Sequence, residues 1–353
     1  IYLAIAKDRE PTLLLPLGCG TSLVNIPLSG AIDQVGANGQ VTEGALSTLF
    51  NAGIANELFP LILFIGIGAM IDFGPLLSNP KMLLFGAAAQ FGIFFAMTAA
   101  VLLGFDLADA ASIGIIGAAD GPTSILVSQV LHSNYIGPIA VAAYSYMALV
   151  PIIQPMAVKL VTTKKERRIK MPYNPRNVSR RLRICFPILV TVIAGFIAPM
   201  SVSLVGFLMF GNLLRECGCL GSLSETAQNV LAKLITLLLG ITISFSMKAD
   251  QFVNINTIII MALGLVAFVF DTIAGVMFAK LLNLFSKTKV NPMVGAAGIS
   301  AFPMSARVIQ KLGQEADSQN HLLMHAVGAN VAGQIASVLA GGMILNLVPQ
   351  LLS

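Results

Sequence analysis

Residues 117–124 read Gly-Ala-Ala-Asp-Gly-Pro-Thr-Ser and place one carboxylate, Asp120, beside a helix-breaking Gly-Pro pair. The rest of the chain is apolar enough to lie in lipid, with 56% hydrophobic and 10% charged residues and a mean hydropathy of +0.85. This composition is outside the range of ordinary soluble domains and indicates a polytopic membrane protein. An ionisable side chain in such a protein is energetically costly and usually faces a partner, a cavity or an ion path. Asp120 is therefore the first candidate for the functional site.

The net charge of +5 does not indicate nucleic-acid binding, because most basic residues lie beside apolar segments, where membrane topology explains them. The chain starts with an apolar run that ends at residues 7–10, and we interpret it as the tail of a helix whose start is missing. Four cysteines are present, and the last two form Cys-Gly-Cys without a second Cys or His pair at metal spacing. We expect free thiols, and a metal site is the less favoured alternative, at Cys19, Cys185, Cys217 and Cys219.

Apolar runs long enough to cross a bilayer divide most of the chain. They cover residues 11–29, 58–77, 82–104, 135–160, 184–199, 201–215, 228–247, 254–284 and 321–349. Two further runs, 111–131 and 292–312, are interrupted by Gly, Pro and polar residues. These two interrupted runs decide the topology.

Basic residues predict the orientation, because cytoplasmic loops are enriched in Lys and Arg. The segment 159–183 is strongly basic and is predicted to be a cytoplasmic linker, with Lys159, Lys164, Lys165, Arg167, Arg168, Lys170, Arg176, Arg180, Arg181 and Arg183. The same side is predicted for Lys7, Arg9, Lys81, Arg215, Lys287 and Lys289. The loops 30–57 and 105–110 carry acidic residues without Lys or Arg and are predicted to lie outside.

Counting crossings makes 111–131 a re-entrant hairpin from the outer side and 292–312 a re-entrant hairpin from the cytoplasm. The acidic Glu315 and Asp317 fit the second assignment poorly. With the first helix included, each half has five crossings and one hairpin, and an odd number inverts one half relative to the other. The predicted fold is an all-α polytopic membrane protein with two inverted repeats, each of about five transmembrane helices plus one re-entrant or broken hairpin. The first repeat covers residues 1–160, the basic linker 161–183 and the second repeat 184–353.

An internal repeat supports this division. Aligning Pro122 with Pro303 gives six further identities without a gap, and they fall at the two interrupted runs. Chance similarity between Gly- and Ala-rich membrane segments is the alternative explanation. The identities are Gly114 with Gly295, Gly117 with Gly298, Ser124 with Ser305, Val127 with Val308, Gln129 with Gln310 and Leu131 with Leu312.

Inverted repeats with broken helices build midplane ion sites in many secondary transporters, because unwound backbone presents carbonyl groups and helix ends to a cation. We therefore expect 117–124 and 295–300 to meet in the interior. Asp120 supplies the negative charge, and the neutral oxygen donors are Thr123, Ser124, Asn291, Ser300 and backbone carbonyls. Oxygen ligands suit a hard cation, so sodium or a proton is the expected cargo, with sodium favoured. A helix-capping role for Asp120, and helix back-bonding by the hydroxyl groups, remain the structural alternatives.

Other polar residues have two interpretations each. Arg307 is either an anion clamp or a positive-inside anchor. Tyr146 donates a proton or a hydrogen bond, or only packs. Asn330 binds cargo or bonds between helices. Asp72, His321 and His325 lie near segment ends where solvation suffices, and Asp271 has no explanation in the sequence.

Four motifs resemble the beta subunit of sodium-pumping biotin-dependent decarboxylases, a family that includes oxaloacetate, methylmalonyl-CoA, glutaconyl-CoA and malonate decarboxylases. They are Gly-Ala-Ala-Asp-Gly-Pro-Thr at 117–123, Tyr-Ser-Tyr-Met-Ala-Leu-Val-Pro-Ile-Ile-Gln-Pro at 144–155, Met-Phe-Gly-Asn-Leu-Leu-Arg-Glu-Cys-Gly at 209–218 and Asn-Pro-Met-Val-Gly-Ala-Ala-Gly-Ile-Ser at 291–300. The resemblance runs from about residue 11 to the C-terminus. Several motifs in the same order make it specific.

The resemblance implies a subunit that removes CO2 from carboxybiotin, consumes a proton and exports sodium ions. It implies that Asp120 is the main sodium ligand, that Asn291 and Ser300 assist, and that Gly295 allows close backbone approach. Thr123 and Asn330 complete the expected sodium-binding set. Tyr146 and Arg307, together with Asp120, are the expected catalytic residues, serving proton delivery and the carboxybiotin end.

The chain lacks the Met-Lys-Met biotinylation motif, so the resemblance implies that biotin arrives on a separate biotin carrier protein. The other implied partners are a carboxyltransferase alpha subunit, a small membrane-anchor subunit (gamma or delta), lipid, and further copies of this chain, for example in a trimer. The implied location is the bacterial cytoplasmic (inner) membrane. A sodium-coupled secondary transporter of an organic anion or proton is the alternative function, and a scaffold whose polar residues only pack is the third.

Overall fold

The computed structural model describes residues 1–6, 11–35, 39–173, 178–286 and 288–352. Four of the residues used for the orientation, namely Lys7, Arg9, Arg176 and Lys287, lie outside these ranges.

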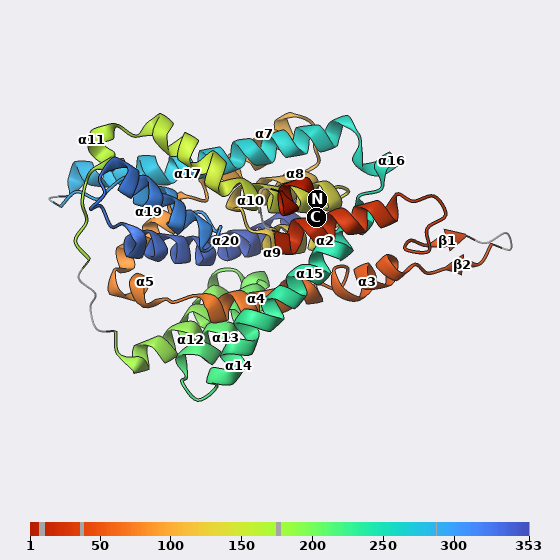
Figure 1. Cartoon of the computed structure of the whole chain (residues 1–353), viewed down its shortest axis with the longest axis horizontal. Coiled ribbons are helices and arrows are strands. Elements are labelled where there is room, and N and C mark those ends of the chain that lie inside the picture. Colours follow the sequence, from red (N-terminus) through yellow and green to blue (C-terminus); the bar gives the residue numbers. More distant parts are fainter. Residues whose placement is uncertain (7–10, 36–38, 174–177, 287, 353) are drawn as a thin grey trace.

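Helices dominate the described chain (Figure 1). Up to the linker they are α1 (Tyr2–Ile5), α2 (Pro11–Val24), α3 (Ala45–Gly53), α4 (Leu58–Met70), α5 (Gly74–Ser78), η1 (Pro80–Met82), α6 (Leu83–Ala88), α7 (Phe91–Leu102), α8 (Leu107–Gly114), η2 (Ile115–Ala118), α9 (Gly121–Val130), α10 (Ile136–Val161) and α11 (Lys164–Arg167). After it come α12 (Arg180–Ile197), η3 (Pro199–Ser201), α13 (Val202–Glu216), α14 (Gly221–Thr226), η4 (Ala227–Leu231), α15 (Ala232–Ile243), η5 (Ser244–Ser246), α16 (Ala249–Phe252), α17 (Ile255–Phe285), α18 (Met293–Ala296), α19 (Met304–Ala316) and α20 (Leu323–Leu352).

Five helical segments are long and apolar enough to cross a membrane, which makes this a multi-pass membrane protein. They are Pro80–Leu102, Ile136–Val161, Gly221–Ser246, Ile255–Phe285 and Leu323–Leu352, and α3 with α4 adds a sixth if the two helices, bent by 62°, form one span. The predicted ten crossings are therefore not confirmed. The predicted runs at 184–199 and 201–215 form α12, which starts with three arginines in four residues, and α13, which has 15 residues.

The loop 30–57 contains regular secondary structure that the sequence analysis did not predict. It contains a short antiparallel hairpin, β1 (Gln34–Val35) and β2 (Val41–Thr42), followed by α3. The strands have two residues each, so the predicted all-α class of the fold is confirmed. The hairpin projects from the right-hand end of the molecule in Figure 1, and α11 and the linker lie at the left-hand end.

The first interrupted run is a hairpin, as the crossing count predicts. Near its start, the carboxylate of Asp109 accepts hydrogen bonds from the hydroxyl group of Ser133 (2.6 Å) and the backbone N–H of Asn134 (2.9 Å), which follow its end. The chain thus enters through α8, breaks at Ala119 and Asp120, and returns through α9 to the point of entry.

The second interrupted run is a hairpin as well. Asn291 before it and Asn320 after it both donate side-chain hydrogen bonds to the carbonyl oxygens of Arg167 and Ile169 in the linker. The linker therefore holds both ends of this hairpin. The entrance of the first hairpin lies beside α3, because Ser133 and Asn134 line a small pocket together with Phe50 of α3. Since α3 and the linker lie toward opposite ends of the molecule, the two hairpins enter from opposite ends (Figure 1). This agrees with the inverted relation of the two halves, which stays a prediction.

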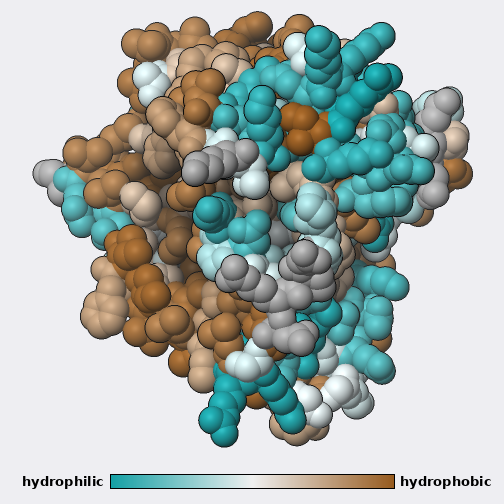
Figure 2. Space-filling view, turned by 90° about the vertical axis from the view of Figure 1, so that its left-hand side faces the viewer, coloured by the Kyte–Doolittle hydropathy of each residue, from teal (hydrophilic) through white to brown (hydrophobic). Residues whose placement is uncertain are grey.

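The linker end gathers the charged residues, and Figure 2 shows their hydrophilic surface beside hydrophobic flanks. Glu315 and Asp317, which fit the topology poorly in the sequence, pair with Lys159 (3.1 Å) and Lys170 (3.2 Å) of the linker region. The acidic residues therefore lie at this end because basic residues of the linker balance them.

Candidate cation site

Asp120 lies at the break of the first hairpin. The 3-10 turn η2 ends the first arm, Ala119 takes a left-handed conformation (φ 53°), and Asp120 is extended and caps α9. Its Oδ1 atom accepts the backbone N–H of Thr123 over 3.5 Å, a long bond, and Pro122 sits in the first turn where no N–H is needed. The capping role considered for Asp120 is therefore present but weak.

The second oxygen of Asp120 has a much richer environment. Its Oδ2 atom accepts hydrogen bonds from Thr123 Oγ1 (2.7 Å), Gln334 Nε2 (3.2 Å), Ser337 Oγ (3.2 Å) and Ser300 Oγ (3.3 Å). These donors come from α9, α20 and the second break. The Asp120 side chain is only 3% exposed. A carboxylate buried this deeply is normally paired with a positive charge.

All of these partners are neutral. Among the described residues, no Lys, Arg or His forms an ion pair with Asp120. Neutral donors stabilise a carboxylate but do not cancel its charge, so the site is suited to a small cation or a proton. The described residues contain no cluster of His, Cys, Asp and Glu suited to a transition metal.

The two breaks meet, as the sequence predicts. The backbone N–H of Ser300 donates to the carbonyl oxygen of Ala118 (3.0 Å). A Cβ atom on Gly333 would overlap the carbonyl oxygen of Gly298, so α20 lies directly on the second break. Asn330 donates to the carbonyl oxygen of Ile299 (2.6 Å) and holds the break from α20, while its own Oδ1 atom has no partner.

Gln334 and Ser337 were missed by the sequence analysis, although a signal for them exists. They follow Asn330 by four and seven residues, so the three polar side chains lie on one face of α20. The Ser337 hydroxyl oxygen also lies 3.0 Å from Ser300 Oγ, so Ser337 contacts both the acid and the second break.

Ser124, the remaining hydroxyl candidate of the first break, bonds its own helix. It donates to the backbone carbonyl oxygen of Asp120 (2.8 Å), which is the back-bonding alternative.

Two other predicted ligands lie elsewhere. Gly295 packs against α17, where a Cβ atom would overlap the carbonyl oxygen of Gly275. Asn291 is bonded to the linker, and none of its hydrogen bonds reaches Asp120. Gly295 thus allows close backbone approach, but between α18 and α17.

Tyr146 and Arg307 are also apart from Asp120. The hydroxyl group of Tyr146 donates to the carbonyl oxygen of Met261 on α17, and Arg307 is exposed on α19. The tyrosine nearest the first break is Tyr144, whose ring lies against Gly121 and whose buried hydroxyl group has no partner.

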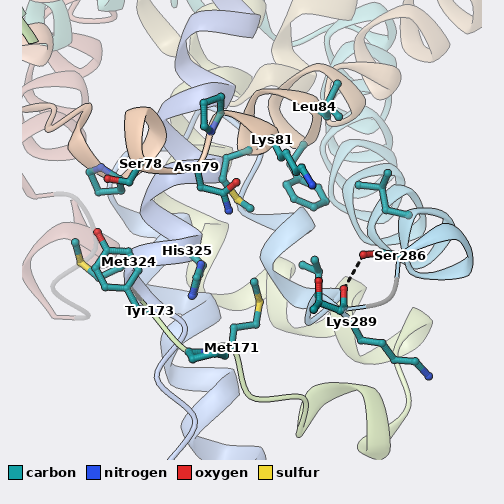
Figure 3. Close-up of a pocket in the computed structure, with 18 of the residues that line it drawn as sticks. Ser78, Asn79, Lys81, Leu84, Met171, Tyr173, Ser286, Lys289, Met324 and His325 are labelled. Atoms are coloured by element: carbon teal, nitrogen blue, oxygen red, sulfur yellow. Dashed lines mark hydrogen bonds between the residues drawn. The ribbon is translucent and has the colours of Figure 1, made fainter. Parts of the chain in front are cut away.

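A cavity of about 970 Å³ opens at the linker end (Figure 3). Linker residues 171–173, the α5–η1 turn, the end of α17 and the start of α20 line it. The ring of His325 lies between Asn79 and Met171 (Figure 3). Phe85 in its wall contacts the second break, because a Cβ atom on Gly298 would overlap its carbonyl oxygen. Phe85 thus separates the cavity from the second break, and Asp120 does not line the cavity.

Broken hairpins that meet at a buried acid define a class of membrane proteins that translocate ions. The sequence model of the Na+-transporting oxaloacetate decarboxylase beta subunit family matches residues 1–348, and the chain belongs to this family. The resemblance drawn from the motifs is confirmed.

Three relatives illustrate its range. The chain is 49% identical to the methylmalonyl-CoA decarboxylase subunit beta of Propionigenium modestum over 98% of this chain and 92% of the relative. It is 48% identical to the glutaconyl-CoA decarboxylase subunit beta of Acidaminococcus fermentans (99% and 90%). It is 43% identical to the oxaloacetate decarboxylase beta chain of Klebsiella pneumoniae (99% and 92%).

Proposed function

We propose that this chain decarboxylates carboxybiotin delivered by a partner subunit and couples the reaction, with consumption of a proton, to export of sodium ions. One observation carries the proposal. The Oδ2 atom of Asp120 collects four neutral donors in the interior, where breaks from both halves of the chain meet, and none of its hydrogen-bond or ion-pair partners among the described residues is positively charged. A charge arranged in this way is balanced by a cation from outside the chain.

The donor set suits sodium. Hydroxyl oxygens from Thr123, Ser300 and Ser337 surround the carboxylate, and hydroxyl groups turn their lone pairs to a cation when one is bound. The amide of Gln334 is oriented by its hydrogen bonds, and rotation of the amide would present its oxygen instead. Hard cations prefer such oxygen ligands. In this proposal, Asn330 and Asn291 are positioning residues that hold the second hairpin.

The cavity at the linker end is a suitable entry for the carboxybiotin head group. It adjoins basic residues, since Lys81 and Lys289 line it, and an anionic carboxylate is attracted to such a surface. Figure 3 shows Lys289 extending away from the centre of the cavity. In this position its ammonium group would contact an anionic ligand before the ligand enters the cavity. Tyr146 and Arg307 are proposed to serve proton delivery and the carboxybiotin end.

The partners of this function are a biotin carrier protein, a carboxyltransferase alpha subunit and a small membrane-anchor subunit. The proposed location is the bacterial cytoplasmic membrane, in an assembly with several copies of this chain. The acyl substrate of the whole complex is chosen by the carboxyltransferase.

The test uses purified protein in liposomes supplied with free carboxybiotin. Sodium-stimulated release of CO2 with uptake of ²²Na⁺ is expected, and the Asp120→Asn variant should lose both. Asp106→Asn is the matched control, because Asp106 caps α8 at the hairpin entrance and should leave the sodium response unchanged. Sodium-coupled uptake of an organic anion or proton without CO2 release would instead establish the alternative, a secondary transporter.

A further inference from the structure

A second acid, Asp271, is buried in the membrane-spanning helix α17 and has no role in the proposed sodium site. Its side chain is 0% exposed. Its Oδ1 atom accepts the backbone N–H of Gly92, and its Oδ2 atom has no hydrogen-bond partner in the described structure. A fully buried carboxyl oxygen without a partner requires an explanation, because leaving such an atom unsatisfied is unfavourable.

Part of the explanation is structural. The span Pro80–Leu102 is broken between α6 and α7, and Gly92 lies in the first turn of α7, where backbone N–H groups lack partners within the helix. Asp271 satisfies one of them from the neighbouring helix. An asparagine could accept the same bond, so capping explains the acceptor but not the ionisable group.

The described elements around Asp271 supply no counter-charge. The elements packed against α17 are α6, α7, α8, α10, α18 and η2. Their titratable side chains are Asp109 on α8 and Tyr144, Tyr146 and Lys159 on α10, and α17 itself carries Lys280.

Four of these five groups are bonded elsewhere, and the fifth, Tyr144, is an uncharged phenol whose buried hydroxyl group has no partner in the described residues. Lys159 pairs with Glu315 and Lys280 with Glu166. Asp109 bonds Ser133, Tyr146 bonds Met261, and the ring of Tyr144 lies against Gly121.

The oxygen donors near Asp271 are also too few for sodium. The adjacent Thr272 hydroxyl group is buried without a partner, and the groups that donate toward the Asp271 carboxyl group in the described residues are the backbone N–H groups of Gly92 and Ile93, which cannot act as metal ligands. A metal ion in a dehydrated site needs several oxygen ligands, whereas a proton needs one. The unpartnered Oδ2 atom therefore fits a proton.

Asp271 also touches the first hairpin. A Cβ atom on Gly117 would lie 2.8 Å from Asp271 Oδ2, and Gly117 is in η2, three residues before Asp120. Movement of this arm changes the surroundings of the Asp271 carboxyl group directly.

We propose that Asp271 is a proton-binding site of the translocation cycle, and that it holds a proton when the first hairpin has the arrangement seen here. The destination of the proton rests on the proposed function. In that reaction the C–N bond of carboxybiotin breaks, CO2 leaves, and the ureido nitrogen, which keeps the electron pair, takes one proton. The Asp271 O–H bond breaks as the proton leaves, and the carboxylate is reprotonated from water in the next cycle.

Infrared spectroscopy during a pH titration, without carboxybiotin, tests the site independently of the reaction. The protein should show a protonated carboxyl band that Asp271→Asn removes and that the exposed-carboxyl control Glu225→Gln retains. Asp271→Asn keeps an acceptor for Gly92 and should fold, whereas Asp271→Ala should lower the melting temperature. An unchanged spectrum in Asp271→Asn would overturn the proposal, and Asp271 would then serve only as a helix cap for α7.

An activity assay tests whether the proton on Asp271 takes part in the reaction cycle. Sodium-dependent decarboxylation should fall at least tenfold in Asp271→Asn and recover in part in Asp271→Glu, with a shifted pH profile. A wild-type rate and pH profile in Asp271→Asn would contradict the role in the cycle. If the carboxyl band is present but the wild-type protein releases no CO2, the proposed function fails and the proton site stands.

Discussion

Ser300 donates its backbone N–H to the carbonyl oxygen of Ala118 over 3.0 Å, which joins the breaks of two hairpins from opposite halves of the chain. The same residue turns its hydroxyl group to Asp120 (3.3 Å). The arrangement of donors around Asp120, the candidate cation site, therefore needs both hairpins in place. A change in either hairpin alters the site, which is the property that a coupled pump or transporter requires.

Removing one hydroxyl group from the site should weaken sodium binding. Ser337→Ala deletes a neutral donor next to Asp120 and Ser300, with a loss of about 1 kcal/mol, or roughly fivefold in affinity. The sodium concentration for half-maximal activity should rise by this factor. Ser128→Ala is the matched control, because Ser128 is equally buried but bonds only its own helix. Equal shifts in the two variants would contradict the assignment of Ser337.

Adding a methyl group at Gly295 should push α18 away from α17. Gly295→Ala places a Cβ atom against the carbonyl oxygen of Gly275, and overpacking of this kind destabilises by about 1–3 kcal/mol. A lower melting temperature is expected. Gly206→Ala is the control, since its Cβ atom would meet only Thr191 at 3.7 Å, an ordinary contact. Wild-type stability of Gly295→Ala would show that α18 does not need this close approach.

The sequence predicted the parts of the site that interrupt an apolar run, because breakers and charges are visible there. Asp120 and Ser300 belong to this group. Gln334 and Ser337 were not predicted, because α20 is apolar on average. Their only signal in the sequence is that they follow Asn330 at helical spacing. Asn291 was expected at the site but binds the linker, since a motif does not show which way a side chain points.

The ten predicted crossings stay a prediction, because five helical segments of the described structure are long and apolar enough to cross a membrane. Hydropathy reports the length of an apolar run, but it does not report a bend such as the 62° between α3 and α4. It also does not show which charges pair. Glu315 and Asp317 contradicted the orientation until the structure placed them beside Lys159 and Lys170.

The linker should become more dynamic when one of the two asparagines that hydrogen-bond its backbone is removed. Asn320→Ala deletes hydrogen bonds to the carbonyl oxygens of Arg167 and Ile169, worth about 1 kcal/mol each. Hydrogen exchange of the linker amides should become roughly 5- to 30-fold faster. Asn51→Ala, an exposed residue of α3, should leave the linker unchanged. Equal exchange in Asn320→Ala and wild type would show that the linker does not depend on the hydrogen bonds of Asn320.

The linker should also respond to acid through Asp317. The backbone N–H of Gln319 and then the ammonium group of Lys170 hold the pKa of Asp317 below its ordinary value. A pKa that is lower in the folded state stabilises the contact above the unfolded pKa of about 4, and this contribution is lost as the pH falls through the folded value.

Exchange of the linker amides, corrected for the intrinsic rate, should therefore be constant from pH 8 to 5 and rise below about 4. Asp317→Asn should show the faster exchange at neutral pH and lack the acid-dependent rise attributed to this pair. An identical acid response in wild type and Asp317→Asn would exclude the pair as its cause.

The most direct test of the central claim, that Asp120 binds sodium, is the melting temperature of the purified protein in NaCl compared with choline chloride at equal ionic strength. A ligand that binds the folded state stabilises it by about 2.7 kcal/mol at 100 times its dissociation constant. The wild-type and Ser128→Ala proteins should melt at higher temperature in NaCl, and Asp120→Asn should melt at the same temperature in both salts. A sodium-dependent shift of wild-type size in Asp120→Asn would contradict the account.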